Sequence, residues 1–231
     1  MENLIDVLSV GNRYLNATDH YFKLNDTTVI NTIPNVHILH SRMSDSIVSD
    51  VANYMDTVNN NSADKDLVAN ISGDQSEMDL NNPLMHKYRD KLLKSAQDYI
   101  KIHTNEIYTV GVQASWSVKM NSGDFNPIHK HDVDTPSGLA TICYIKVPKN
   151  INNSLKDGCL DFSWNRETAD RWDMFEQRES TTVLPVVGDY YVFPKWLNHT
   201  VYPYRGDEDR WSIQSNLFIF KDDKGENDAK D

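Results

Sequence analysis

The sequence predicts a mostly β domain with a sandwich or barrel core and two α-helices near the N-terminus. Before residue 107, apolar residues recur at helical spacing in two segments. From there to residue 220, short β-rich runs follow one another with turns between them. Several short strands with no helix between most of them are typical of a sandwich or barrel.

The length of 231 residues is that of one domain. We expect residues 1–220 to form it, with 1–106 as an N-terminal α/β support and 107–220 as the β core. Residues 221–231 carry mostly charged side chains and are predicted to be a disordered tail. The stretch Asn165–Ser180, charged and aromatic-bearing, interrupts the strands and is long enough to be a lid or a binding loop.

The N-terminal part contains one predicted strand, Asn35–His40, and two predicted helices. The first helix has Ser44 or Asp45 as its N-cap and apolar residues at helical spacing up to Val58. The second runs from Met85 to Ile100, with Pro83 near its start. Between them, the polar stretch Asn59–Asp79 is interpreted as a surface loop.

The strands predicted for the core are separated by turns that are rich in Gly, Asn and Asp. They are Tyr108–Val112, Ala114–Val118, Ala140–Val147, Cys159–Phe162, Thr181–Val187, Tyr190–Phe193, His199–Val201 and Trp211–Phe220. The cysteines, Cys143 and Cys159, do not make a disulfide framework, and we expect both to be buried as small hydrophobic side chains.

The charge balance excludes some classes of partner. The chain has 34 acidic and 23 basic residues, a net charge of −11, so neither a nucleic acid nor an anionic membrane is an expected partner. No apolar run reaches the roughly 18–20 residues of a spanning helix. The N-terminus lacks the basic start of a signal peptide, which favours a soluble protein of a reducing compartment.

Three of the eight histidines are arranged as metal ligands could be. His129 and His131 are two residues apart, so on a strand their imidazoles point to one face. A barrel that folds back could bring His199 beside them. Imidazole suits Fe, Zn, Cu and Ni alike, so the pattern does not choose the metal. The alternative for the pair is solvated side chains near a turn. The other five are expected to be structural or at the surface: His20, His37, His40, His86 and His103.

Arg210 and Ser212 share one face of the last predicted strand. An inward-pointing arginine in a barrel is costly unless it meets an anion. A forked cation beside a hydroxyl forms a good clamp for a carboxylate. The alternative is an arginine at the rim, paired with a nearby acid such as Asp207, Glu208 or Asp209.

The order of these motifs carries a family resemblance. Trp116 and Phe125–His131 are followed by Tyr144–Pro148, then by Gly-Asp-x-x-x-Phe-Pro-x-x-Leu-x-His from Gly188 to His199, then by Arg210–Ile213. Together they resemble the Fe(II)/2-oxoglutarate-dependent oxygenases over roughly residues 108–220. The chain is most similar to the small prolyl-hydroxylase-like members of bacteria and phages. The resemblance implies a double-stranded β-helix, which is a jelly-roll, cupin-like barrel, and a cytoplasmic protein of a bacterium or a phage-infected host.

The resemblance also implies a ligand set. His129 and His199 correspond to the two histidine ligands of the iron. The third ligand of most relatives is a carboxylate two residues after the first histidine, and here that position is His131. We expect a site of three histidines, with Asp132 as the fallback ligand if a bulge turns it inward.

The resemblance implies a binding site for the cosubstrate as well. Arg210 corresponds to the residue that binds the distal carboxylate of 2-oxoglutarate, and Ser212 to one that adds a hydrogen bond. Tyr144 reaches the same carboxylate from the facing strand, and Asn126 helps near the metal.

The function that follows is an Fe(II)- and 2-oxoglutarate-dependent oxygenase, with O2 as the oxidant. It couples oxidative decarboxylation of 2-oxoglutarate to succinate and CO2 with hydroxylation of a small molecule or a protein residue. Two alternatives stay open. One is a cupin-like metal enzyme, an isomerase or a dioxygenase that does not use 2-oxoglutarate. The other is a metal-binding barrel without catalysis. The oligomeric state is open too.

Overall fold

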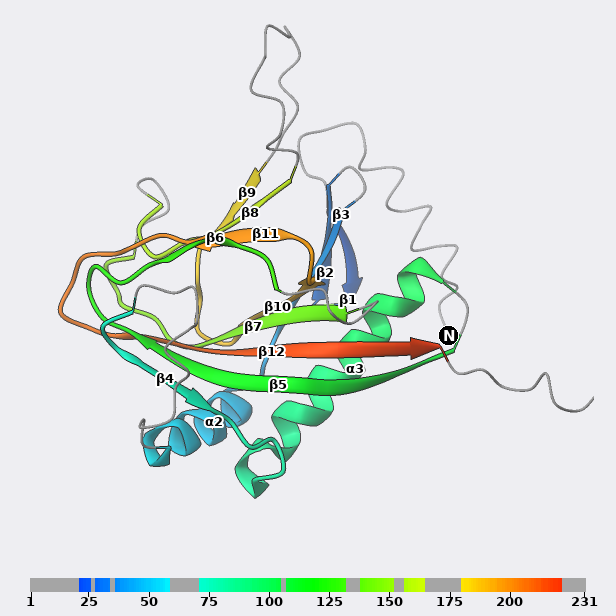
Figure 1. Ribbon diagram of the computed structural model, residues 1–231, viewed down its shortest axis with the longest axis horizontal. Coiled ribbons are helices and arrows are strands. Elements are labelled where there is room, and N and C mark those ends of the chain that lie inside the picture. The colour runs from blue at the N-terminus through cyan, green and yellow to red at the C-terminus, as the bar shows by residue number, and fades with distance from the viewer. Residues whose placement is uncertain are drawn as a thin grey trace, which may run out of the picture.

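The computed structural model describes residues 21–25, 28–33, 36–58, 71–104, 107–131, 138–151, 156–164 and 180–221. In these ranges the chain forms two antiparallel sheets and two α-helices (Figure 1). The elements are β1 (Tyr21–Asn25), β2 (Thr28–Ile33), β3 (Val36–Arg42), α2 (Asp45–Thr57), β4 (Asp74–Glu77), the 3-10 helix η1 (Pro83–Met85), α3 (His86–His103), β5 (Tyr108–Met120), β6 (Asn126–His129), β7 (Gly138–Lys146), β8 (Leu160–Ser163), β9 (Ser180–Val183), β10 (Asp189–Pro194), β11 (Asn198–Val201) and β12 (Arg210–Lys221). This confirms the predicted mostly β fold with two helices.

The two sheets of the described chain differ in size. The large one has eight strands in the order β1-β2-β3-β10-β7-β12-β5-β4, and the small one has four in the order β6-β11-β8-β9. The small sheet lies over one face of the large sheet and the helices lie over the other (Figure 1). The arrangement is the expected double-stranded β-helix, enlarged at the large sheet by strands from the N-terminal part of the chain.

Side-chain alternation divides the interior into two apolar clusters. On β10, Tyr190 and Val192 face the helices, whereas Tyr191 and Phe193 face the small sheet. All four are buried, which explains why this strand reads as an unbroken apolar run. The helix-side cluster packs the scaffold, and the cluster between the sheets surrounds the pocket described below.

Helix α2 forms where its cap and apolar face predict, and α3 forms where its apolar face predicts. The Ser44 hydroxyl caps α2 by accepting a hydrogen bond from the backbone N–H of Ile47. Val51 and Met55 on α2, and Leu92 on α3, are fully buried against the large sheet. None of the helices in the described ranges is long and apolar enough to cross a membrane.

Several elements differ from the sequence prediction, which had no strand at β1, β2 or β6. The runs predicted as Tyr108–Val112 and Ala114–Val118 are one strand, β5, with Gln113 as the extra residue where its register with β12 shifts. Residues 74–77, predicted as part of a loop, form the edge strand β4 against β5. A short edge strand with polar side chains has no apolar alternation to reveal it.

Several predictions fall on residues outside the described ranges. These are most of the loop from residue 59, the insertion up to residue 179, the tail from residue 222, and His20. Both cysteines are buried as predicted, Cys143 in β7 and Cys159 just before β8.

Truncating Leu92 tests the helix-side packing. We expect Leu92→Ala to lower the free energy of unfolding by about 2–5 kcal/mol, because the side chain is fully buried and its removal leaves a cavity. Gln97→Ala, at an exposed position of the same helix, is the matched control and should change stability little. Denaturant unfolding of both variants measures this, and equal losses would contradict the packing described here.

Candidate active site

Two of the candidate histidines face each other across paired strands. His129 on β6 and His199 on β11 are direct partners in the antiparallel register. Their ring centroids are 4.2 Å apart. Cross-strand partners project to the same face of a sheet, so the pairing of β6 with β11 is what brings together side chains 70 residues apart.

Backbone carbonyls orient both rings. Nδ1 of His129 lies 2.8 Å from the carbonyl oxygen of Pro127, and Nδ1 of His199 lies 3.0 Å from that of Leu197. A carbonyl only accepts, so in each ring Nδ1 carries the proton and Nε2 presents a lone pair. A hydrogen bond of this kind on the far nitrogen fixes the tautomer in metal-ligating histidines.

His131 completes the group from the segment that follows β6. Its backbone N–H donates to the carbonyl oxygen of Lys195 at 3.0 Å, which fastens it to the turn between β10 and β11. Its Nε2 lies 3.2 Å from Nε2 of His199. One ligand atom from each of His129, His131 and His199 lies within 4.8 Å of the others. Among the described residues, no carboxylate joins this group.

The Gly-Asp start of the sequence motif holds β10 in place. Gly188 has a φ of 85°, a conformation that favours glycine, and its N–H donates to the Tyr144 carbonyl at 2.8 Å. The Asp189 carboxylate lies 3.1 Å from Nη1 of Arg42 and 3.2 Å from Nε2 of His40. These contacts fix β10 between β3 and β7.

The end of the same motif builds the wall and the turn behind His199. The Phe193 ring lies 5.1 Å from the His199 ring, centroid to centroid. The backbone N–H of Leu197 donates to the Pro194 carbonyl and closes the turn, and the Leu197 carbonyl then receives Nδ1–H of His199. The spacing of Phe, Pro, Leu and His therefore has a structural reason at each position.

Burial keeps the three imidazoles neutral. Desolvation lowers the pKa of His129, lowers that of His131 to about 4, and lowers that of His199 well below its ordinary value. Nearby histidines add to the effect at His131 and His199. Neutral imidazoles with free lone pairs are the form that binds a metal ion.

A buried guanidinium lies at the other end of the same space. Arg210, 1% exposed, is the first residue of β12 and pairs with Met120 on β5. Its Nη1 contacts the Met120 sulfur at 2.9 Å, and its guanidinium carbon lies 5.0 Å from the centroid of the Tyr144 ring. Its Nε and Nη2 have no hydrogen-bond partner among the described residues. The structure therefore does not support the alternative of a rim arginine paired with an acid.

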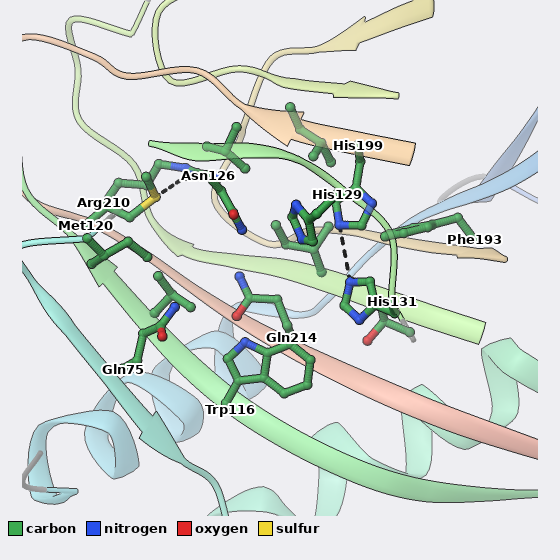
Figure 2. A pocket seen from close by; sticks show the side chains of 16 residues that line it. Gln75, Trp116, Met120, Asn126, His129, His131, Phe193, His199, Arg210 and Gln214 are labelled. Carbon is green, nitrogen blue, oxygen red and sulfur yellow. Dashed lines mark hydrogen bonds between the residues drawn. The ribbon is translucent and has the colours of Figure 1, made fainter. Parts of the chain in front are cut away.

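One pocket joins these two features, with the histidines at one end and Arg210 at the other (Figure 2). It encloses about 500 Å³, including its open mouth. Arg210 is the one charged side chain among the described residues that line it. The others are Ile71, Gln75, Trp116, Val118, Met120, Asn126, His129, His131, Thr141, Ile142, Leu160, Phe193, His199, Val201 and Gln214.

Of the remaining predicted site residues, one lines the pocket, two are buried outside its lining, and one lies outside the described residues. Asn126 lines the pocket between its two ends (Figure 2). Tyr144 and Ser212 are buried beside Arg210 but are not among the lining residues. The Ser212 hydroxyl accepts a hydrogen bond from Nε2 of Gln214 at 3.0 Å. Asp132, the fallback ligand, lies outside the described residues.

Several lining residues were not singled out from the sequence, among them Gln214, Gln75 and Met120. Gln214 continues the face of Arg210 and Ser212 by simple alternation, so its position was readable. Gln75 comes from β4, which was not recognised as a strand. The other described histidines lie elsewhere: His40 contacts Asp189, His37 contacts His103, and His86 contacts the Asn81 carbonyl.

A comparison with protein families identifies the core. Residues 114–216, from β5 into β12, match the family described as "Putative 2OG-Fe(II) oxygenase". This part of the chain is similar to the 2OG-Fe(II) oxygenases. This segment contains the three clustered histidines and Arg210, and the match confirms the resemblance seen in the sequence. None of the curated proteins matches the chain.

Solved structures of other proteins share the fold. A prolyl-4-hydroxylase from Pseudomonas putida superposes with a TM-score of 0.52 at 15% identity, covering 78% of this chain and 91% of its own. HygX from Streptomyces hygroscopicus, with nickel and 2-oxoglutarate bound, gives 0.55 at 11% identity, with 78% and 82% covered. A prolyl hydroxylase from Trichoplax adhaerens, in complex with a hypoxia-inducible factor peptide, gives 0.50 at 17%, with 76% and 77% covered.

The pKa shifts predict how stability depends on pH. Between the ordinary histidine pKa of 6.5 and the value of about 4 for His131, the unfolded chain binds more protons than the folded, metal-free protein. The free energy of unfolding should therefore decrease as the pH falls through this range, and these groups should contribute no pH dependence above it.

Denaturant unfolding of the metal-free protein above and below pH 6.5 measures this. His131→Gln removes one of the titrating groups, so its profile should be flatter than that of the unchanged protein. Gln97→Ala, at an exposed position of α3 that carries no titrating group, should not change the slope. Identical slopes for all three proteins would contradict the neutral, buried state of His131.

Proposed function

We propose that this chain is an Fe(II)- and 2-oxoglutarate-dependent oxygenase of the hydroxylase type. One observation carries the proposal. A single pocket has three neutral imidazoles at one end and, at the other, a buried guanidinium with N–H groups that have no partner among the described residues. A metal ion fits the first end and a carboxylate fits the second. A keto diacid that spans the pocket satisfies both.

The histidine end fits a metal ion of the iron type. His129 and His199 present Nε2 lone pairs that their carbonyl partners hold in place, and His131 presents its ring to the same point. Imidazole is a good ligand for Fe, Ni, Cu and Zn, so the donor set admits iron without selecting it. Among the solved structures with this fold, HygX has been determined with iron bound and with nickel and 2-oxoglutarate bound, which supports iron and 2-oxoglutarate here.

The Arg210 end fits a carboxylate. Nε and Nη2 are two neighbouring donors of the guanidinium fork, and a carboxylate accepts both in parallel. Ser212 accepts from Gln214, so its own O–H is available to donate to the same anion. Tyr144 packs against the guanidinium and holds its plane. In this proposal Arg210 and Ser212 bind the distal carboxylate of 2-oxoglutarate, and Asn126 lies along its length.

The chemistry divides between the bound groups and the chain. Iron with 2-oxoglutarate supplies activation of O2, coupled to decarboxylation of the keto acid to succinate and CO2 and to oxidation of the substrate. The three imidazoles hold the metal without adding negative charge, and Arg210 fixes the keto acid in one orientation. Phe193 and Trp116 exclude water from the walls around the histidines. The substrate is a small molecule or a protein residue, the two kinds named for the structural neighbours.

Removing His199 tests the metal end. We expect His199→Ala to weaken Ni(II) binding at least about 100-fold, since even the loss of a group that only orients a ligand costs about 10–100-fold. His86→Ala, an exposed histidine of α3, is the matched control and should bind Ni(II) like the unchanged protein. Isothermal titration calorimetry gives both affinities. Equal affinities would show that the metal binds elsewhere.

Changing Arg210 tests the cosubstrate end, and with it the proposed function. 2-Oxoglutarate should bind the Ni(II)-loaded protein, in which nickel stands in for iron without redox chemistry, and should not bind the metal-free protein. Arg210→Lys loses the fork, so its affinity for 2-oxoglutarate should fall about tenfold or more while Ni(II) affinity stays unchanged. Arg205→Lys, at an exposed position, is the matched control. Unchanged 2-oxoglutarate affinity in Arg210→Lys would overturn the assignment, and Ni(II) binding without 2-oxoglutarate binding would favour a cupin-like enzyme.

A further inference from the structure

Met120 lies directly against the charge that the proposed cosubstrate must reach. It is the last residue of β5 and the cross-strand partner of Arg210, and its sulfur lies 2.9 Å from Nη1 (Figure 2). It also lines the pocket. A side chain in this position shares the guanidinium with any anion that enters.

A thioether is a poor partner for a guanidinium. Its sulfur is a weak hydrogen-bond acceptor, and the Nε and Nη2 groups of Arg210 have no partner among the described residues. A sulfoxide oxygen on the same sulfur is a strong acceptor. It would receive a charge-assisted hydrogen bond from Arg210 and occupy the space in front of the fork.

We propose that Met120 is an oxidation site, and that its sulfoxide blocks the anion-binding site at Arg210, so that 2-oxoglutarate no longer binds there. This block of 2-oxoglutarate binding rests on the proposed function. The oxidant is hydrogen peroxide or another small peroxide. The methionine sulfur gives up two electrons, the O–O bond breaks, one oxygen forms the sulfoxide and the other leaves as water. Reduction of the sulfoxide by a methionine sulfoxide reductase restores the anion-binding site.

The other methionines of the described chain provide an internal comparison. Met120 is 2% exposed, and the other four are as deeply buried. They are Met43, Met55, Met78 and Met85, and all belong to the cluster between the helices and the large sheet. None of these four lines the pocket, whereas Met120 does. A small peroxide therefore has an open path to Met120 and would need the core to open before it reached the others.

The first experiment measures the site of oxidation. The metal-free protein, which avoids iron-driven side reactions, is treated with hydrogen peroxide, and peptide mass spectrometry follows the sulfoxide at each methionine. Met120 should be oxidised at least about tenfold faster than Met43, Met55, Met78 and Met85. A rate at Met120 equal to those of the four core methionines would overturn the proposal.

The second experiment measures the consequence. After oxidation, the affinity of the Ni(II)-loaded protein for 2-oxoglutarate should fall about tenfold or more, and a methionine sulfoxide reductase should restore it. Met120→Leu should show no such response relative to its own affinity before peroxide, whereas Met43→Leu, which changes a core methionine, should respond like the unchanged protein. Full oxidation of Met120 with unchanged affinity for 2-oxoglutarate would overturn the proposal that the sulfoxide blocks the anion-binding site.

Failure of the proposed function is recognised separately, from the protein before peroxide. If the unoxidised, Ni(II)-loaded protein binds no 2-oxoglutarate, the proposed function fails and the proposed effect of the Met120 sulfoxide falls with it. If the unoxidised protein binds 2-oxoglutarate as expected but oxidation does not weaken that binding, only the proposed effect of the Met120 sulfoxide is overturned.

Discussion

The buried positive charge of Arg210 is the constraint on which the rest of the site depends. A guanidinium with unpartnered N–H groups in an apolar interior costs several kcal/mol in lost hydration. The described residues of the pocket wall offer it no carboxylate. That cost is lowered when an anion binds, so the charge favours a ligand with a carboxylate at that end. The chain tolerates it because the large sheet is stabilised elsewhere.

The stabilisation comes from the opposite face of the same sheet. Helices α2 and α3 bury an apolar cluster that extends to β12, the strand that begins with Arg210. Because β12 pairs with β5 and β7 along most of its length, its first residues are held by strands that also pack toward the helices. Side chains of β12 that point to opposite faces of the sheet therefore have different roles. Ile213 and Leu217 pack against the helix side, and Arg210 and Gln214 face the pocket.

A metal site of three neutral imidazoles fits this charge distribution. A carboxylate ligand would add a negative charge at the histidine end of the pocket. With His131 as the proposed third ligand, a bound cation would keep more of its positive charge for the keto acid. In the proposed function, the anionic ligand would be attracted at both ends, by the metal and by Arg210.

Much of this could be predicted from the sequence, and the rest could not for identifiable reasons. The spacing of His129 and His131 suggested that they lie together, but the strand expected to hold both ends at His129, and the backbone contact to Lys195 positions His131 instead. His199, Arg210 and the Gly188–His199 motif were readable from their order along the chain. The strand β4, and Gln75 with it, was missed because a short polar edge strand has no period of apolar residues. The bulge at Gln113 split one strand into two apparent runs.

The side-chain contacts could not be read from the sequence either. That Met120 lies against Arg210, and that the Leu197 carbonyl orients His199, depend on register, which the sequence does not give.

The measurement that tests the central claim most directly is the visible absorption spectrum of the protein without oxygen. Fe(II) is added first and 2-oxoglutarate second. If one pocket holds both, a weak charge-transfer band appears only when both are present, because it requires the keto acid to chelate the protein-bound iron. Iron that binds stoichiometrically while no band appears on addition of 2-oxoglutarate would contradict the account, since the metal end and the carboxylate end would then not act on one ligand.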